Sequence, residues 1–67
     1  MDSVTLTPAM EDYLEAILRL VAAEGEARVK RIAEALSVHK STVTAALKRL
    51  VSDGLVEHRP YGAATLT

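Results

Sequence analysis

The most constraining feature of the chain is the segment from Val29 to Leu55, in which two short apolar stripes follow each other. The first has the i, i+3, i+4, i+7 spacing of one helix face and consists of Val29, Ile32, Ala33 and Leu36. The second starts after Ser37-Val38-His39 and consists of Val43, Ala46, Leu47 and Leu50. It ends at Asp53-Gly54, where glycine suits the left-handed backbone position that terminates a helix. The spacing predicts two helices joined by a tight turn, a helix-turn-helix over about 29–53.

A longer helix is predicted before this segment and a hairpin after it. Thr7-Pro8 is a helix start, because threonine caps free N–H groups and proline fits the first turn. Gly25 ends this helix of about 8–24, and residues 1–6 precede it as a loose arm. Two short runs around Pro60-Tyr61-Gly62 predict a β-hairpin over about 55–66, which is the position of the wing in a winged helix. The expected fold is mainly α with a small β-hairpin: one winged helix-turn-helix domain, with three helices plus a wing, over residues 1–67.

Size and composition limit what such a chain does. A chain of 67 residues buries a thin core, expected to consist of Leu14, Ile17, Val21, Ile32, Leu36, Val43, Leu47, Leu50, Leu55 and Leu66. The chain has no cysteine, so disulfides and thiolate zinc sites are excluded. It has no apolar run of membrane-spanning length and no secretory h-region, which favours a cytoplasmic protein without a membrane partner. No Gly-rich phosphate loop or supported Ser/His/acid set is present, so an enzyme is not expected.

The charges are unevenly divided along the chain. The total is −1, but residues 1–26 carry one cation against six acids, a net charge of −5. Residues 27–67 carry seven cations against three acids, a net charge of +4. The basic part contains the helix-turn-helix, as phosphate contacts require, although solvated helix faces produce the same pattern.

The second helix of the pair carries a polar strip that suits the major groove of double-stranded DNA. Ser41, Thr42, Thr44, Ala45 and Lys48 form this strip, in which hydroxyls and the ammonium reach phosphates and Ala45 meets a thymine methyl. Further predicted DNA contacts are Arg28, Lys30, His39, Lys40, Arg59 and Tyr61. Purely structural interpretations of these residues stay open. Ser41, Thr42 and Thr44 are also explained as ordinary helix-start residues, Arg28 and Lys30 as solvated cations, and His39 as a cap. His58 is interpreted as a solvated strand residue.

Three stretches carry a family resemblance. They are Met10-Glu11-Asp12-Tyr13-Leu14-Glu15, Ala27-Arg28-Val29 with Ile32-Ala33-Glu34-Ala35-Leu36, and Val38-His39-Lys40-Ser41-Thr42-Val43-Thr44. With them the chain resembles, from Pro8 to Thr67, the N-terminal domain of the diphtheria-toxin-repressor family, and most of all its manganese-responsive branch. The first stretch is the most specific, since strings like the second recur in many bacterial regulators.

The resemblance implies a metal-dependent transcriptional repressor that binds operator DNA as a homodimer. In that family Mn²⁺ or Fe²⁺ binds between this domain and a C-terminal dimerisation domain, which this chain does not contain. The family's D-x-x-E ligands fall on Asp12 and Glu15, and hard carboxylate oxygens favour manganese. The chain therefore holds half of such a site. From the residues alone, the pair is equally explained by the helix dipole and by a Glu15–Arg19 ion pair.

Two other functions stay open. One is a metal-independent winged-helix regulator controlled by a small ligand, in which Asp12 and Glu15 are surface acids. The other is a winged helix that contacts only proteins, which the total charge of −1 permits.

Overall fold

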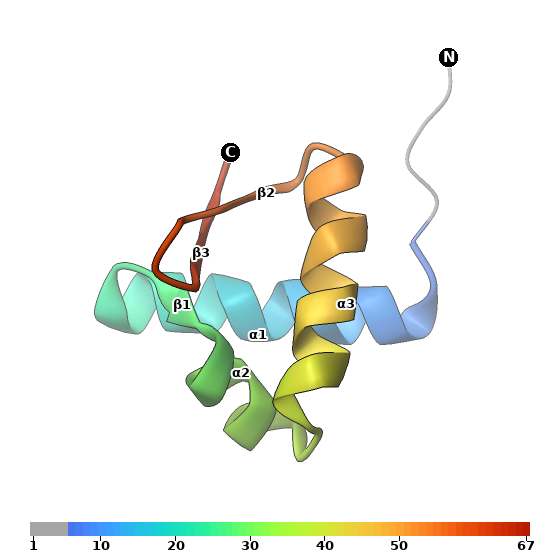
Figure 1. The fold of residues 1–67 in the computed structure, drawn as a ribbon, viewed down its shortest axis with the longest axis horizontal. Coiled ribbons are helices and arrows are strands. Elements are labelled where there is room, and N and C mark those ends of the chain that lie inside the picture. Colours follow the sequence, from blue (N-terminus) through green and yellow to red (C-terminus); the bar gives the residue numbers. More distant parts are fainter. Residues whose placement is uncertain (1–5) are drawn as a thin grey trace.

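The computed structural model describes residues 6–67, which form three helices and a small sheet (Figure 1). The helices are α1 (Pro8–Glu24), α2 (Val29–Leu36) and α3 (Lys40–Ser52), and the strands are β1 (Ala27–Arg28), β2 (Val56–His58) and β3 (Ala63–Leu66). The predicted fold class is confirmed. The predicted arm lies outside the described residues except for Leu6, which packs against the edge of the core. None of the described helices has the length and apolar character needed to cross a membrane.

The first helix begins and ends with the residues that its sequence predicts. The Thr7 hydroxyl accepts a hydrogen bond from the Met10 N–H at 3.1 Å, and Pro8 occupies the first turn. Gly25 ends α1 at a φ of 87°, where its N–H donates to the Val21 carbonyl at 2.8 Å. A left-handed residue at this point turns the chain away from the helix, and only glycine adopts it without a steric cost.

The sheet contains one strand more than the predicted hairpin. Its order is β1-β3-β2 and all pairs are antiparallel, with Val56 opposite Leu66 in the hairpin. The added strand β1 pairs Ala27 with Ala64 and Arg28 with Ala63. Two residues are too few to show strand alternation, which is why the sequence did not indicate β1. This strand connects the wing to the segment between α1 and α2.

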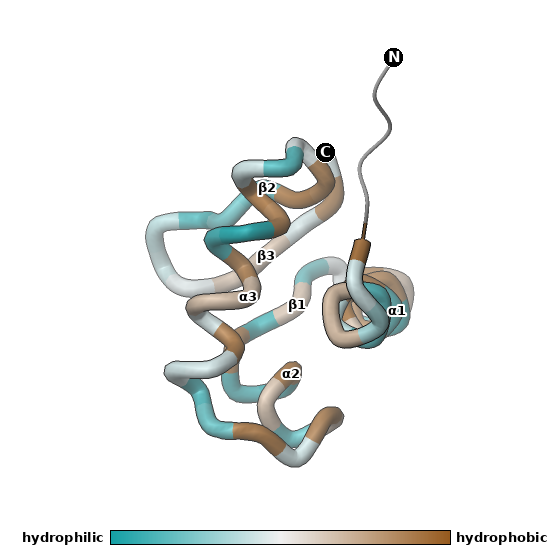
Figure 2. The backbone as a smooth tube through the Cα atoms, turned by 90° about the vertical axis from the view of Figure 1, so that its right-hand side faces the viewer, coloured by the Kyte–Doolittle hydropathy of each residue, from teal (hydrophilic) through white to brown (hydrophobic). Residues whose placement is uncertain are grey.

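The core lies where the three helices meet. Ile17, Ile32 and Leu47, one from each helix, are fully buried, and Val43, Leu50 and Val56 lie beside them. Leu14, Val21, Leu36 and Leu55 were expected in the core and surround it as partly buried residues. The prediction for Leu66 was wrong, because its side chain is 37% exposed at the end of β3. Figures 1 and 2 show β3 leading to the C-terminal end of the chain.

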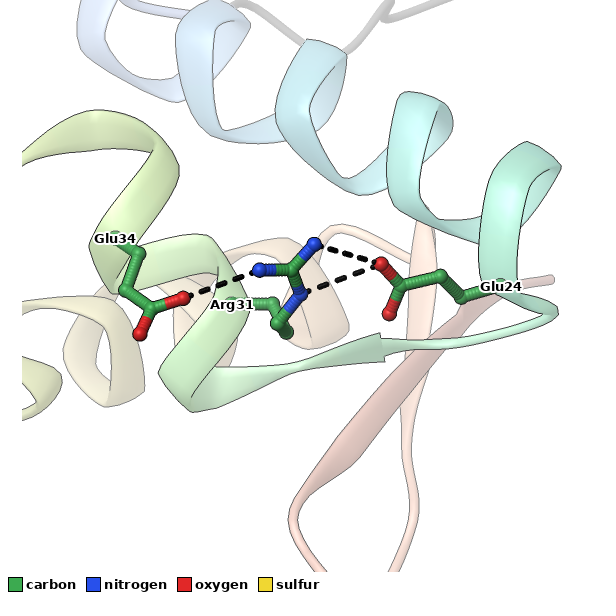
Figure 3. Close-up of polar contacts among 3 residues, drawn as sticks. All are labelled: Glu24, Arg31 and Glu34. Atoms are coloured by element: carbon green, nitrogen blue, oxygen red, sulfur yellow. Dashed lines mark hydrogen bonds and ion pairs between the residues drawn. The ribbon is translucent and has the colours of Figure 1, made fainter.

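An arginine connects α2 to the end of α1 (Figure 3). The Nη2 and Nε atoms of Arg31 donate to Glu24 Oε2 at 2.9 and 3.2 Å, and its Nη1 donates to Glu34 Oε1 at 3.2 Å. The bonds to Glu24 raise the pKa of the Arg31 guanidinium above its usual range. This bridge joins α2 to the end of α1 on the solvent side.

Candidate nucleic-acid interface

The exposed face of α3 combines small side chains with positive charge. Its buried residues are Val43, Ala46, Leu47 and Leu50. Ser41, Ala45 and Lys48 are exposed, and α3 lies across α1 (Figure 1). From Lys40 to Ser52 the helix has no acidic residue. An uninterrupted surface of this kind approaches a polyanion without like-charge repulsion.

Two threonines of the predicted strip lie away from its centre. Thr44 is only partly exposed, and its hydroxyl donates to the Lys40 carbonyl of its own helix at 3.0 Å. A DNA contact of Thr44 stays a prediction. Thr42 is exposed and borders, together with Ala45 and Arg49, an apolar groove of about 520 Å³ against the first turns of α1.

The turn between α2 and α3 brings cations from both helices together. His39 occupies the N-cap position of α3, but its side chain makes no capping hydrogen bond, so that part of its interpretation was wrong. Its carbonyl accepts from the Thr42 and Val43 N–H groups at 3.0 and 3.2 Å, and the residue is exposed. Lys30, Lys40 and Ser41 surround the same shallow hollow, together with His39 and Glu34.

The wing ends in a tight turn over residues 59–62. The Gly62 N–H donates to the Arg59 carbonyl at 3.0 Å, and Gly62 has a φ of 91°. Tyr61 is 68% exposed on this turn, and Arg59 is exposed beside it. His58 is exposed on β2, opposite Ala64 in the register. The turn therefore presents the two side chains that the sequence assigned to the backbone or minor groove.

Glu26 is the residue of this region that the sequence did not indicate. Its Oε1 accepts from the Tyr61 hydroxyl at 3.1 Å, and its Oε2 accepts from Arg28 Nε at 3.0 Å. The hydrogen bond from Arg28, and after it that from Tyr61, holds the pKa of the Glu26 carboxyl below its usual range. Because Tyr61 is 35 residues away in the chain, no local spacing signals this contact.

Asp12 and Glu15 lie one turn apart on α1, as their spacing predicts. Both are exposed and border one small hollow of about 180 Å³ against Ala35 and Leu36 of α2. Glu15 also accepts from Arg19 Nη2 at 3.3 Å, the ion pair that the sequence indicated. Within residues 6–67 no group of three or more His, Cys, Asp or Glu side chains gathers in one place. Two carboxylates fit a hard divalent ion as part of its ligand set, and more donors are needed to complete it.

Known proteins are similar to this chain both in sequence and in fold. Residues 5–64 match the family described as "Iron dependent repressor, N-terminal DNA binding domain". The "HTH-type transcriptional regulator MntR" of Oceanobacillus iheyensis is 46% identical over 61 residues, which are 91% of this chain and 42% of that protein. The protein of the same description from Lysinibacillus sphaericus is 49% identical over 61 residues, covering 91% of this chain and 44% of its own length.

A solved structure agrees with these sequences. The crystal structure of T. acidophilum IdeR superimposes with a TM-score of 0.80 at 33% identity, over 100% of this chain and 30% of that one. The chain thus spans less than half the length of the relatives that it matches. On this match and on its fold, the chain belongs to the iron-dependent repressor family, in which it corresponds to the N-terminal DNA-binding domain.

Proposed function

We propose that the chain is the DNA-binding domain of a manganese- or iron-dependent transcriptional repressor that controls metal homeostasis. The observation that carries this proposal is the acid-free exposed face of α3, on which Ser41, Ala45 and Lys48 are presented by a winged helix-turn-helix. In this fold the corresponding helix enters the major groove, where hydroxyl and ammonium groups contact phosphates and small side chains approach base edges.

The wing and the turn before α3 extend the contact surface on either side of the groove. Arg59 and Tyr61 would reach the DNA backbone or minor groove from the wing. Lys30, His39 and Lys40 would contact phosphates beside the start of α3, together with Arg28 at the start of α2. Most of these contacts are electrostatic, so the affinity should depend steeply on salt.

The metal would act through α1. Asp12 and Glu15 would supply two oxygen ligands to Mn²⁺ or Fe²⁺, and the hollow that they share lies against α2. A bound divalent ion supplies positive charge and fixed ligand geometry at this place. Glu15 must then exchange Arg19 for the ion. The further ligands are predicted to come from regions outside this chain. The protein is also predicted to form a homodimer through a C-terminal domain.

The test is metal-dependent DNA binding by the full-length protein. A duplex from its own promoter is titrated at fixed salt with and without Mn²⁺, using the wild type, Asp12→Asn and Glu15→Gln. We expect tight binding by the wild type with Mn²⁺ only, and loss of that metal response in both variants. Glu57→Gln, which removes an exposed acid of β2, is the charge-matched control and should keep the response.

The role of α3 is tested in the same assay. Lys48→Gln should weaken binding to specific and unrelated duplexes alike and reduce the salt slope by about 1, as expected for one lost phosphate contact. Binding that ignores the metal would refute the metal-dependent mechanism and leave a metal-independent regulator. Absence of binding in every condition would refute DNA recognition and favour a winged helix that contacts proteins.

A further inference from the structure

Glu26 lies between two side chains that belong to the proposed DNA surface. Arg28 is 69% exposed in its side chain, whereas the Glu26 side chain that it contacts is 22% exposed. Tyr61 reaches the same carboxylate from the wing turn, at 3.1 Å from its other oxygen. Arg59 of that turn contributes further positive potential at Glu26. One carboxylate thus occupies two donors that come from different elements and are both open to solvent.

Arg28 and Tyr61 form an anion-binding site that the Glu26 carboxylate occupies. A guanidinium N–H and a phenol O–H converge on the two oxygens of one charged group. A DNA phosphate likewise offers two unesterified oxygens and one negative charge, and charge-assisted bonds from Arg are a common way of holding it. The Tyr61 hydroxyl has a single proton, so it cannot donate to Glu26 and to a phosphate at the same time.

We propose that Arg28 and Tyr61 form a backbone-phosphate site at the base of the wing, and that Glu26 is the internal competitor that closes it when no DNA is bound. The inference rests on the proposed DNA-binding function and adds a way in which the chain limits its own affinity. A phosphate that enters the site takes over both donors and leaves the carboxylate unpaired next to an anion. This cost falls on every duplex and is offset only where the rest of the surface makes its full set of contacts. Glu26 therefore suppresses binding to unrelated DNA.

The competitor mechanism is tested by anisotropy titrations of the full-length protein with Mn²⁺, over a series of KCl concentrations. The promoter duplex and an unrelated duplex of equal length are compared for the wild type and Glu26→Gln. The amide of the variant keeps the shape but no longer holds Arg28 by charge. We expect the affinity for the unrelated duplex to rise roughly tenfold at low salt, the gain of about one charge-assisted hydrogen bond. Its salt slope should become steeper by about 0.9, which corresponds to one additional phosphate.

Two controls separate this effect from simple loss of a negative charge. Glu57→Gln removes the same charge from strand β2, which β3 separates from β1, and should leave the slope unchanged. Arg28→Gln, combined with Glu26→Gln, should abolish the gain, because the freed guanidinium is its source. A gain that survives in the double variant, or a slope that equals that of Glu57→Gln, would refute the proposal.

A decrease in the DNA affinity of Glu26→Gln, instead of the expected increase, has a different meaning. Weaker binding by Glu26→Gln with a shallower slope would make Glu26 a support that orients Arg28, and would likewise overturn the competitor mechanism. Failure of the wild type to bind any duplex would instead refute the proposed function itself. As a second measurement that needs no variant, the NMR signal of the Arg28 Nε–H in the wild type with Mn²⁺ should shift when the promoter duplex is added. An unchanged signal at saturation would contradict an exchange of partners.

Discussion

Hydroxyl groups have different uses in this chain. The Thr7 hydroxyl caps α1, that of Thr44 donates to its own helix, and that of Tyr61 crosses to Glu26. The cap was predictable because threonine is a preferred N-cap residue and proline is favoured at the first helical position. The directions of Thr44 and Tyr61 depend on the helical phase and on a contact between distant residues. At this scale the sequence predicted which residues are polar and exposed better than it predicted what they contact.

The cap supports a direct prediction. Thr7→Ala removes the acceptor of the Met10 N–H and should lower the free energy of unfolding by about 1 kcal/mol, whereas Thr7→Ser should retain most of it. Urea unfolding followed by circular dichroism measures both variants. Equal stability of the alanine variant and the wild type would show that solvent replaces the cap.

Glu26 predicts a specific dependence of stability on pH. Its pKa in the folded state is lowered, first by Arg28 and then by Tyr61, so its contribution to stability is complete above the carboxyl's unfolded-state pKa. It is lost as the pH falls through the lower, folded-state pKa. Urea unfolding at a series of acidic pH values should therefore show a less steep loss for Glu26→Gln than for the wild type. Glu57→Gln is the control, and an equal change in both variants would exclude a special role of Glu26.

At the scale of elements, the apolar periodicity located the three helices because each must bury one face. It overestimated the contribution of large side chains to the core and did not indicate the small ones. Ala27, Ala63 and Ala64 are fully buried in the sheet, where Leu66 was expected to contribute. Alanine is equally common on surfaces, so its burial is decided by how closely strands and helices approach. The two-residue strand β1 escaped prediction for a related reason, since its partner β3 follows more than thirty residues later.

Because the three helices meet in one small core, single buried residues contribute much of the free energy of unfolding. Leu47→Ala opens a cavity among fully buried side chains and should cost about 3 kcal/mol, a large part of the stability of so small a domain. Leu18→Ala is the matched control, because this leucine of α1 is 46% exposed and should cost less than about 0.5 kcal/mol. Thermal unfolding of the two variants compares them directly. Similar losses would place Leu18 in a contact that the described fold does not contain.

For the whole molecule, the division of charge was predictable, and the half-site of Asp12 and Glu15 stays a prediction. The acidic first part of the sequence became α1 with its two candidate ligands, and the basic remainder became α2, α3 and the wing. A sequence predicts the residues of a metal site one by one, but affinity depends on how many donors meet. Asp12 and Glu15 border a common hollow, and no group of three or more His, Cys, Asp or Glu side chains gathers in the described part of the chain.

This predicts that the fold of the chain does not depend on metal. Its core is apolar and built without ligands, and two exposed carboxylates bind Mn²⁺ weakly, so the stabilisation RT ln(1 + [L]/Kd) stays close to zero at micromolar metal. The 67-residue chain should unfold at the same temperature in EDTA and in Mn²⁺. A rise of several degrees with Mn²⁺ would mean that the chain alone supplies a nearly complete site.

The pairing of β1 with β3 has a consequence for which DNA this domain can select. The wing is attached at one end through the short connection after α3 and at the other through β1, and the Val29 N–H donates to the Gly62 carbonyl at 3.4 Å. The distance between α3 and the wing turn is thereby fixed by the sheet. Under the proposed function this distance does not adapt to the DNA, so the duplex must have a groove width that matches it. Base pairs that no side chain touches would then help to decide where the protein binds.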